Sequence, residues 1–313
     1  MTPEAQSFLV EQQNPEKGGE VAIVEAAENG DIDMVRYLVE EMGASMHEGR
    51  PLQIAAYYGQ LEIVQYFHHI DPELVKKRNF HGNTALNRAA SNGQLIVVSF
   101  LVDHAKSDID NQANNGLTPV MQAVENGHLE TADFLIQRGA NLRKLDSSLG
   151  DSVGHLAAYF GHLELLTKII HMEPFLGTLK NNRNMTMLHY AVEGGHNKVV
   201  DFLLSFLPSD DQDIFGCSAV IDAVKYGRGQ ILNILLNHGA DVSLQDGNGF
   251  TCLHWAAKQG DDDLVQVLAA KDPRLLVTVE KRGLNALQIA EESQQNSTIT
   301  TLQSIIELKR LEL

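Results

Sequence analysis

The sequence predicts an all-α solenoid built from stacked pairs of helices. The main observation is a glycine that returns at intervals of 29 to 34 residues, always with an alanine four residues before it. These period glycines are Gly30, Gly59, Gly93, Gly127, Gly161, Gly195, Gly227 and Gly260. A period near 33 is typical of a repeat array, in which each copy contacts mainly its neighbours. The 313 residues are therefore expected to form one continuous array rather than two globular domains.

The first helix of each repeat is expected to end at the period glycine. A hydroxyl residue begins it, because the side-chain oxygen accepts hydrogen bonds from the amides of the first turn. These residues are Thr84, Thr118, Ser152, Thr186, Ser218 and Thr251. Alanine pairs such as Ala256 and Ala257 let neighbouring helices approach closely, and the glycine ends the helix in a left-handed conformation.

A second helix follows at once. In the fourth copy, Leu129, Ala132, Leu135 and Ile136 form an apolar stripe at helical spacing. Some second helices end in Gly-Ala and lead into an extended hairpin. Others end at a proline, which stops the helix and lets the following leucines tuck under the next hairpin. The proline endings are Asp71-Pro72, Glu173-Pro174 and Asp272-Pro273.

The ends and the seventh copy depart from this pattern. Residues 1–19 are expected to form an N-terminal lead that is either flexible or contains a short helix around Phe8. The first copy, from about Glu20, lacks the hydroxyl start, as suits a capping repeat whose outer face meets water. In the seventh copy the spacing shortens to 32 residues, so a tight or irregular finger is expected before Ser218. A closing helix containing Leu302 and Leu308 ends the array.

The clearest copy reads Gly249-Phe250-Thr251-Cys252-Leu253-His254-Trp255-Ala256-Ala257. It resembles the ankyrin repeat, and the resemblance covers nearly the whole chain. The resemblance implies paired antiparallel helices with short β-hairpin fingers, in about nine repeats including terminal caps. It also implies that His155, His189 and His254 bridge neighbouring repeats by hydrogen bonds. The expected repeats are 20–47, 48–78, 79–113, 114–146, 147–180, 181–212, 213–245, 246–279 and 280–313, which form a single domain over 20–313.

Composition limits the possible partners. The formal net charge is −17, and a chain this acidic is a poor candidate for nucleic acid, where affinity comes from neutralising phosphates. Two cysteines are too few for a disulfide scaffold and favour a reducing compartment. No apolar run approaches the ~20 residues that span a bilayer, and no secretory leader or lipidation motif stands out. The expectation is a cytoplasmic or nuclear monomer without membrane insertion.

No catalytic, metal or cofactor site is expected. Cys252 stands at a helix start, which can activate a thiol, but it fills a position that the repeat itself occupies. His68-His69 and Asp261-Asp262-Asp263 could hold a cation, although acids at a helix start also suit the helix dipole. No glycine-rich phosphate loop or paired-cysteine motif occurs. An enzyme hidden in the repeats is the least favoured reading.

Function is expected at positions that the repeat does not dictate. These are the two residues before each period glycine, the hairpin tips, and the slot position, four residues after each helix-starting residue. Aromatic residues are only 6% of the chain, yet many fall there, and such residues dominate binding hot spots. The partner-binding candidates are Tyr57, Tyr58, Phe80, Arg88, Tyr159, Phe160, Tyr190, Phe215, Tyr226 and Trp255. For Tyr190 and Trp255, packing between repeats is an equal alternative.

The preferred interpretation is a non-enzymatic scaffold that binds another protein on its concave face. The alternative is a host-targeting ankyrin effector or adaptor secreted by an intracellular bacterium, which would act in the host cytosol. Lys258 and Gln259, next to Trp255, mark the eighth copy as one with features of its own.

Overall fold

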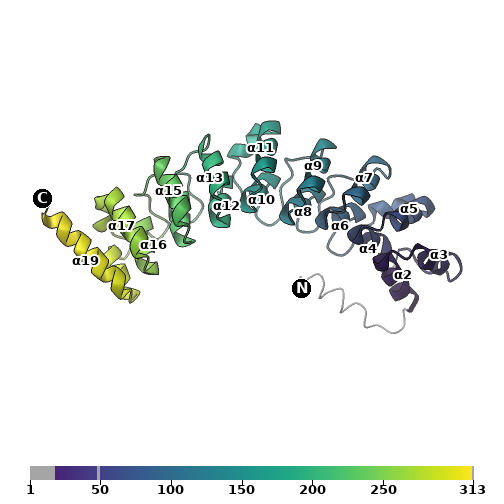
Figure 1. Ribbon diagram of the computed structural model, residues 1–313, viewed down its shortest axis with the longest axis horizontal. Helices are drawn as coiled ribbons and strands as arrows, with labels where there is room; N and C mark the ends of the chain where they lie inside the picture. The colour runs from purple at the N-terminus through teal and green to yellow at the C-terminus, as the bar shows by residue number, and fades with distance from the viewer. Residues whose placement is uncertain (1–17, 48–49, 312–313) are drawn as a thin grey trace. The chain divides into compact units, whose positions relative to one another are not determined.

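The computed structural model describes residues 18–47 and 50–311, so nearly all of the predicted lead over residues 1–19 lies outside the described part. The chain divides into two compact units, residues 1–148 (unit 1) and 149–313 (unit 2), shown as ribbons in Figure 1. In the described residues, regular structure is helical apart from isolated β-bridge residues, which include the antiparallel pair Gln212 and Ser218. The prediction of an all-α repeat solenoid is confirmed.

The helices come in pairs. Unit 1 contains α2 (Gly18–Asn29), α3 (Ile32–Glu40), α4 (Pro51–Tyr58), α5 (Leu61–Ile70), η1 (Pro72–Lys76), α6 (Ala85–Ser91), α7 (Leu95–Asp103), α8 (Pro119–Glu125) and α9 (Leu129–Gln137). Unit 2 contains α10 (Val153–Tyr159), α11 (Leu163–Met172), η2 (Pro174–Thr178), α12 (Met187–Gly194), α13 (Asn197–Leu204), α14 (Ala219–Lys225), α15 (Gly229–Asn237), α16 (Cys252–Gln259), α17 (Asp262–Lys271), η3 (Pro273–Leu276), α18 (Ala286–Glu292) and α19 (Asn296–Leu311).

The first helix of each pair packs against the first helix of the next pair within the same unit. We call these the inner helices: α2, α4, α6 and α8 in unit 1, and α10, α12, α14, α16 and α18 in unit 2. Close packing is possible because their facing residues are small, and Ala256 and Ala257 are fully buried. The second, outer helices bury larger side chains such as Leu135 and Leu166. Removing one such leucine would cost about 2–5 kcal/mol.

Side chains cap most of the inner helices that the sequence predicts to begin at a hydroxyl residue. The hydroxyl of Thr251 lies 2.8 Å from Nδ1 of His254, which also accepts a hydrogen bond from the Thr251 amide. The opposite ring nitrogen of His254 reaches the Leu284 carbonyl in the next repeat at 3.2 Å. His155 and His189 bridge to Met185 and Cys217 in the same way, which confirms the bridging role. Burial lowers the pKa of His254 and keeps its ring neutral.

The hairpin fingers are tight turns. In the finger of the seventh copy, the Asp213 amide donates to the Cys217 carbonyl, and the Gly216 amide donates to the Asp213 carbonyl. The fingers at 79–83 and 246–250 are bonded identically. Of the two forms expected for this finger, tight or irregular, it adopts the tight one. The cap of the seventh copy differs from the prediction, because the buried Ser218 hydroxyl makes no hydrogen bond.

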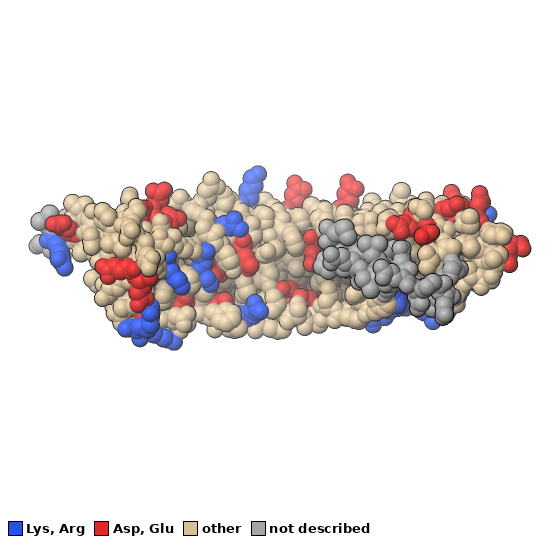
Figure 2. All heavy atoms as spheres, turned by 90° about the horizontal axis from the view of Figure 1, so that it is seen from below, with Lys and Arg blue, Asp and Glu red and all other residues tan. Residues whose placement is uncertain are grey.

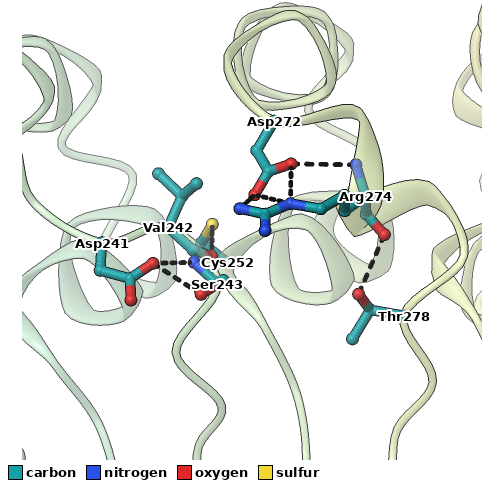
Figure 3. A network of polar contacts seen from close by, with 7 residues as sticks. All are labelled: Asp241, Val242, Ser243, Cys252, Asp272, Arg274 and Thr278. Atoms are coloured by element: carbon teal, nitrogen blue, oxygen red, sulfur yellow. Dashed lines mark hydrogen bonds and ion pairs between the residues drawn. The ribbon is translucent and has the colours of Figure 1, made fainter.

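The proline endings form short 3-10 turns. Asp272 caps η3 by accepting a hydrogen bond from the Arg274 amide, and its carboxylate also binds the Arg274 guanidinium at 2.8 Å (Figure 3). Leu275 and Leu276 are buried beneath the turn, as predicted. The same capping by Asp71 occurs in η1, so this ending is an architectural device.

Candidate partner-binding surface

In unit 1, three predicted residues lie together on neighbouring inner helices. The Tyr57 and Tyr58 rings from α4 meet edge to face at 5.1 Å, and the Arg88 guanidinium from α6 lies 4.2 Å from the Tyr57 ring. Tyr58 is 41% exposed, although burial and a hydrogen bond to Glu28 raise its pKa to about 12. Cation–π stacking of this kind fixes a planar cation against a flat ring.

Beside this cluster lies a cavity of about 500 Å³. Its lining is about equally polar and apolar and comes from the inner helices on one side and the hairpin tips on the other. The lining includes Tyr57, Arg88, Asn114, Asn115, Gln122 and Glu125. At its edge, the side chain of Gln122 donates to buried Asn83 at 2.7 Å. Groups of this kind suit the polar side chains or backbone of a bound peptide.

Phe80 is half exposed at a hairpin tip of unit 1. Its ring lies under the Arg50 guanidinium at 3.6 Å, so Phe80 also belongs to a cation–π pair.

In unit 2, Tyr159 and Phe160 close the C-terminal end of α10. Their rings meet edge to face at 5.1 Å, and Tyr159 is 37% exposed. Tyr190 from α12 lies 6.1 Å from Tyr159 but is only 7% exposed. Its hydroxyl donates to Asp151 at 2.5 Å and accepts from Asn181 at 3.0 Å. Tyr190 thus packs between repeats, whereas Tyr159 presents surface.

Trp255 lies at the centre of a second cluster in unit 2. Its indole N–H donates to the buried carboxylate of Asp246 at 3.0 Å, and Phe250 packs 5.3 Å from its ring. The ammonium groups of Lys258 and Lys225 lie 4.9 Å and 5.3 Å from the ring centre. Trp255 is half-buried, and its plane is fixed by these contacts.

Asp222 occupies the slot position between Tyr190 and Trp255. Its side chain is buried, and the Lys225 ammonium lies 3.7 Å away. Burial, with the nearby carboxylates of Asp213 and Glu193, raises the pKa of Asp222 to about 7, and Lys225 opposes this shift. Lys225 also donates to the Cys217 sulfur at 3.3 Å.

The two remaining predicted aromatics are exposed. Tyr226 follows α14 and is 42% exposed, and Phe215 at the neighbouring hairpin tip is 58% exposed.

Cys252 is buried and its thiol donates to the Val242 carbonyl at 3.3 Å (Figure 3). Burial raises its pKa to about 12, so the reactive thiolate is scarce at neutral pH. Asp261 caps α17 through the Leu264 amide, and Asp262 accepts a hydrogen bond from Thr298. Across residues 18–47 and 50–311, no three His, Cys, Asp or Glu side chains are placed to share a metal ion.

The lysines around Trp255 were not among the named partner-binding candidates, although the sequence predicted function at their repeat position and singled out Lys258. Lys225 and Lys258 stand at the same repeat position, two residues before the period glycines Gly227 and Gly260. Their recurrence in consecutive copies is the signal that could have identified them. The cavity of unit 1 had no comparable signal, because its lining combines residues from separate hairpins and helices.

Comparison with protein families matches models described as "Ankyrin repeats (3 copies)" over residues 3–76, 52–146 and 154–246, and "Ankyrin repeats (many copies)" over 235–290. The chain belongs to the ankyrin-repeat family. Repeats of this family form protein-interaction domains.

Individual relatives match only in part. "Ankyrin repeat and SAM domain-containing protein 6" from Mus musculus is 35% identical over 29% of this chain and 11% of its own length. "Potassium channel AKT1" from Oryza sativa subsp. indica is 47% identical over 16% of this chain and 5% of its own. "Glycerophosphocholine phosphodiesterase GDE1" from Candida albicans is 27% identical over 31% of this chain and 8% of its own. This chain therefore spans about a tenth or less of each relative.

None of the helices in the described part of the chain combines the length and apolar character needed to cross a bilayer.

Proposed function

We propose that the chain is a non-enzymatic scaffold that binds a partner protein on its inner surface, formed by the inner helices and hairpin tips. The observation that carries the proposal is the partial exposure of tyrosines on these helices. Tyr58, Tyr159 and Tyr226 are 41%, 37% and 42% exposed, whereas the alanines beside them are fully buried. Tyrosine offers a large contact area with few rotatable bonds, which makes it a frequent binding hot spot.

The chemistry of the molecule agrees with a binding role. The thiol of Cys252 is buried and bonded to a backbone carbonyl, so it is no nucleophile in this state. Both cysteines are unpaired, which suits a reducing compartment such as the cytoplasm or nucleus.

The test replaces Tyr159 and Phe160 together with alanine. Partner binding should weaken by at least about thirtyfold, because truncated aromatic anchors cost about 2 kcal/mol or more. Helical content should stay unchanged, since the His196 side chain bonds the backbone carbonyl of Tyr159 and not its ring. The partner is obtained by affinity purification from a candidate cytosol, and its affinity is measured by calorimetry.

The matched control is Phe175→Ala, which removes an aromatic ring that is 61% exposed on η2 of the same unit. Partner binding should be unaffected by this change. Undiminished binding to the Tyr159→Ala, Phe160→Ala double variant would remove this patch from the proposed surface.

A further inference from the structure

The cluster around Trp255 is preorganised. Asp246 holds the indole N–H, and Phe250 packs against the ring, so the tryptophan cannot turn freely. Lys258 lies over both rings, 4.9 Å from Trp255 and 5.7 Å from Phe250. Lys225 reaches the same tryptophan from α14, the neighbouring inner helix. Two ammonium groups from consecutive repeats are thereby held around one aromatic plane.

Several cations of unit 2 form ion pairs with carboxylates. Lys180 pairs with Asp211, Arg274 with Asp272 and Arg282 with Glu280. Among the described residues, no carboxylate lies within 4 Å of the Lys258 ammonium, and the side chain is exposed. The Lys258 ammonium is therefore an exposed positive charge in a chain whose net charge is −17.

Two acidic groups of the cluster lie below its surface. Asp246 and Asp222 are 7% and 3% exposed, and both are engaged, Asp246 by Trp255 and Asp222 by Lys225. The half-buried carboxylates of Asp213 and Glu193 lie near Asp222, whereas the Lys258 side chain is exposed. Figure 1 draws α12 and α16 below α13 and α17, and Figure 2, seen from below, shows basic and acidic side chains interspersed over this part of unit 2.

We propose that the cluster of Trp255, Lys225 and Lys258 binds an acidic segment of the partner protein, with a carboxylate between the two ammonium groups and aliphatic carbons against the indole face. The inference rests on the proposed function and adds the chemistry of the partner. Complementary charge supplies specificity and speeds association, and the aromatic plane supplies contact area. The acidic character of the rest of the chain disfavours nucleic acid as the natural polyanion.

The test uses the fact that Trp255 is the only tryptophan of the chain, so intrinsic fluorescence reports on this cluster alone. The probe is a ten-residue peptide of alternating glutamate and serine, which does not itself fluoresce. Titration into the full chain should change tryptophan emission saturably. Lys258→Gln should weaken the peptide about fivefold, because an exposed ion pair contributes up to about 1 kcal/mol. Lys258→Glu should weaken it further, and added salt should weaken the wild type.

Lys198→Gln is the matched control, since it removes an exposed lysine from the outer helix α13 of the same unit. It should leave the titration unchanged. An emission that does not change up to ~1 mM peptide, or equal affinity of the wild type and Lys258→Glu, would overturn the inference. Equal binding of a lysine–serine peptide would also overturn it, because the surface would then not select acidic charge. Tighter binding of a single-stranded oligonucleotide would overturn it as well, because the surface would then prefer nucleic acid to protein.

The two proposals fail separately. If partner capture depends on Tyr159 and Phe160 while the acidic peptide ignores Lys258, the scaffold proposal stands and this one falls. If the peptide depends on Lys258 while the Tyr159 and Phe160 variant keeps its partner, the acidic-segment proposal stands and only the Tyr159 and Phe160 patch is removed from the proposed surface.

Discussion

The two units make the same inter-repeat contact with different chemistry. In unit 1, Asn83 stands just before the N-cap of α6 and accepts a hydrogen bond from Gln122, the slot residue of the next repeat. In unit 2, Asp151 stands just before the N-cap of α10 and accepts from Tyr190, again the slot residue of the next repeat. Both pairs are 39 residues apart. The backbone of the repeat fixes where these side chains meet, and the residue types decide what the contact does.

The consequences differ between the units. The side-chain amide oxygen of Gln122 is buried without a hydrogen bond, and the open cavity of unit 1 lies beside it. Asp151, Tyr190 and Asn181 instead form a closed, buried triad in unit 2. The slot residue Gln122 therefore borders an open cavity in unit 1, whereas the slot residue Tyr190 belongs to a closed hydrogen-bonded cluster in unit 2.

The largest expected effect comes from breaking the triad. Asp151→Ala removes the acceptor of the buried Tyr190 hydroxyl and one of the two acceptors of the Asn181 side-chain amide, which should cost about 3 kcal/mol of unfolding free energy. Asn83→Ala, the matched change in unit 1, should cost about 1–2 kcal/mol, because it removes a neutral pair beside an open cavity. Urea unfolding of both variants checks the order. A larger loss for Asn83→Ala would show that the cavity pair, and not the triad, stabilises the array more.

A second prediction concerns Asp222, whose pKa is raised to about 7 while an unfolded carboxyl titrates near ~3.9. Between these values the folded chain keeps a proton that the unfolded chain has lost, so this group's contribution to stability falls as pH rises towards 7. Asp222→Asn resembles the protonated side chain at every pH. The free energy of unfolding of Asp222→Asn, relative to that of the wild type, should therefore rise by about 2 kcal/mol from about pH 5 to pH 8.

Thermal or urea unfolding at several pH values measures this gain. Asp33→Asn, which removes an exposed carboxyl from α3 in unit 1, is the surface control for the same measurements. A constant difference between Asp222→Asn and the wild type across the range would mean that Asp222 titrates as an ordinary carboxyl.

The smallest effect is expected at the cation–π pair of unit 1. Arg88→Gln removes the guanidinium from the Tyr57 ring and should lower stability by about 0.5–1 kcal/mol. Lys258→Gln in unit 2 should cost less, because its ammonium is more exposed and lies farther from the ring. Urea midpoints rank the two. Equal costs would indicate that burial does not distinguish the aromatic clusters of the two units.

The sequence by itself determined the repeat, its helix boundaries and its caps. Period glycines such as Gly161 show why: at φ +77°, an added Cβ would stand 2.4 Å from the His196 ring, so both backbone and neighbour demand glycine. The capping role of Thr251 and His254 could also be predicted from the sequence, because capping joins residues only three positions apart. Such local rules repeat in every copy and need no knowledge of the distant chain.

Tertiary structure decided which of the candidate residues present surface. For Tyr190 the sequence left binding and packing equally open; Tyr190 is buried because Asp151 and Asn181 satisfy its hydroxyl, whereas Tyr159 is 37% exposed. The same holds for Asp222 and Lys225, whose pairing, burial and altered pKa arise from side chains on several elements. Exposure and charge state depend on which groups meet across repeats, and that is settled only when the helices stack.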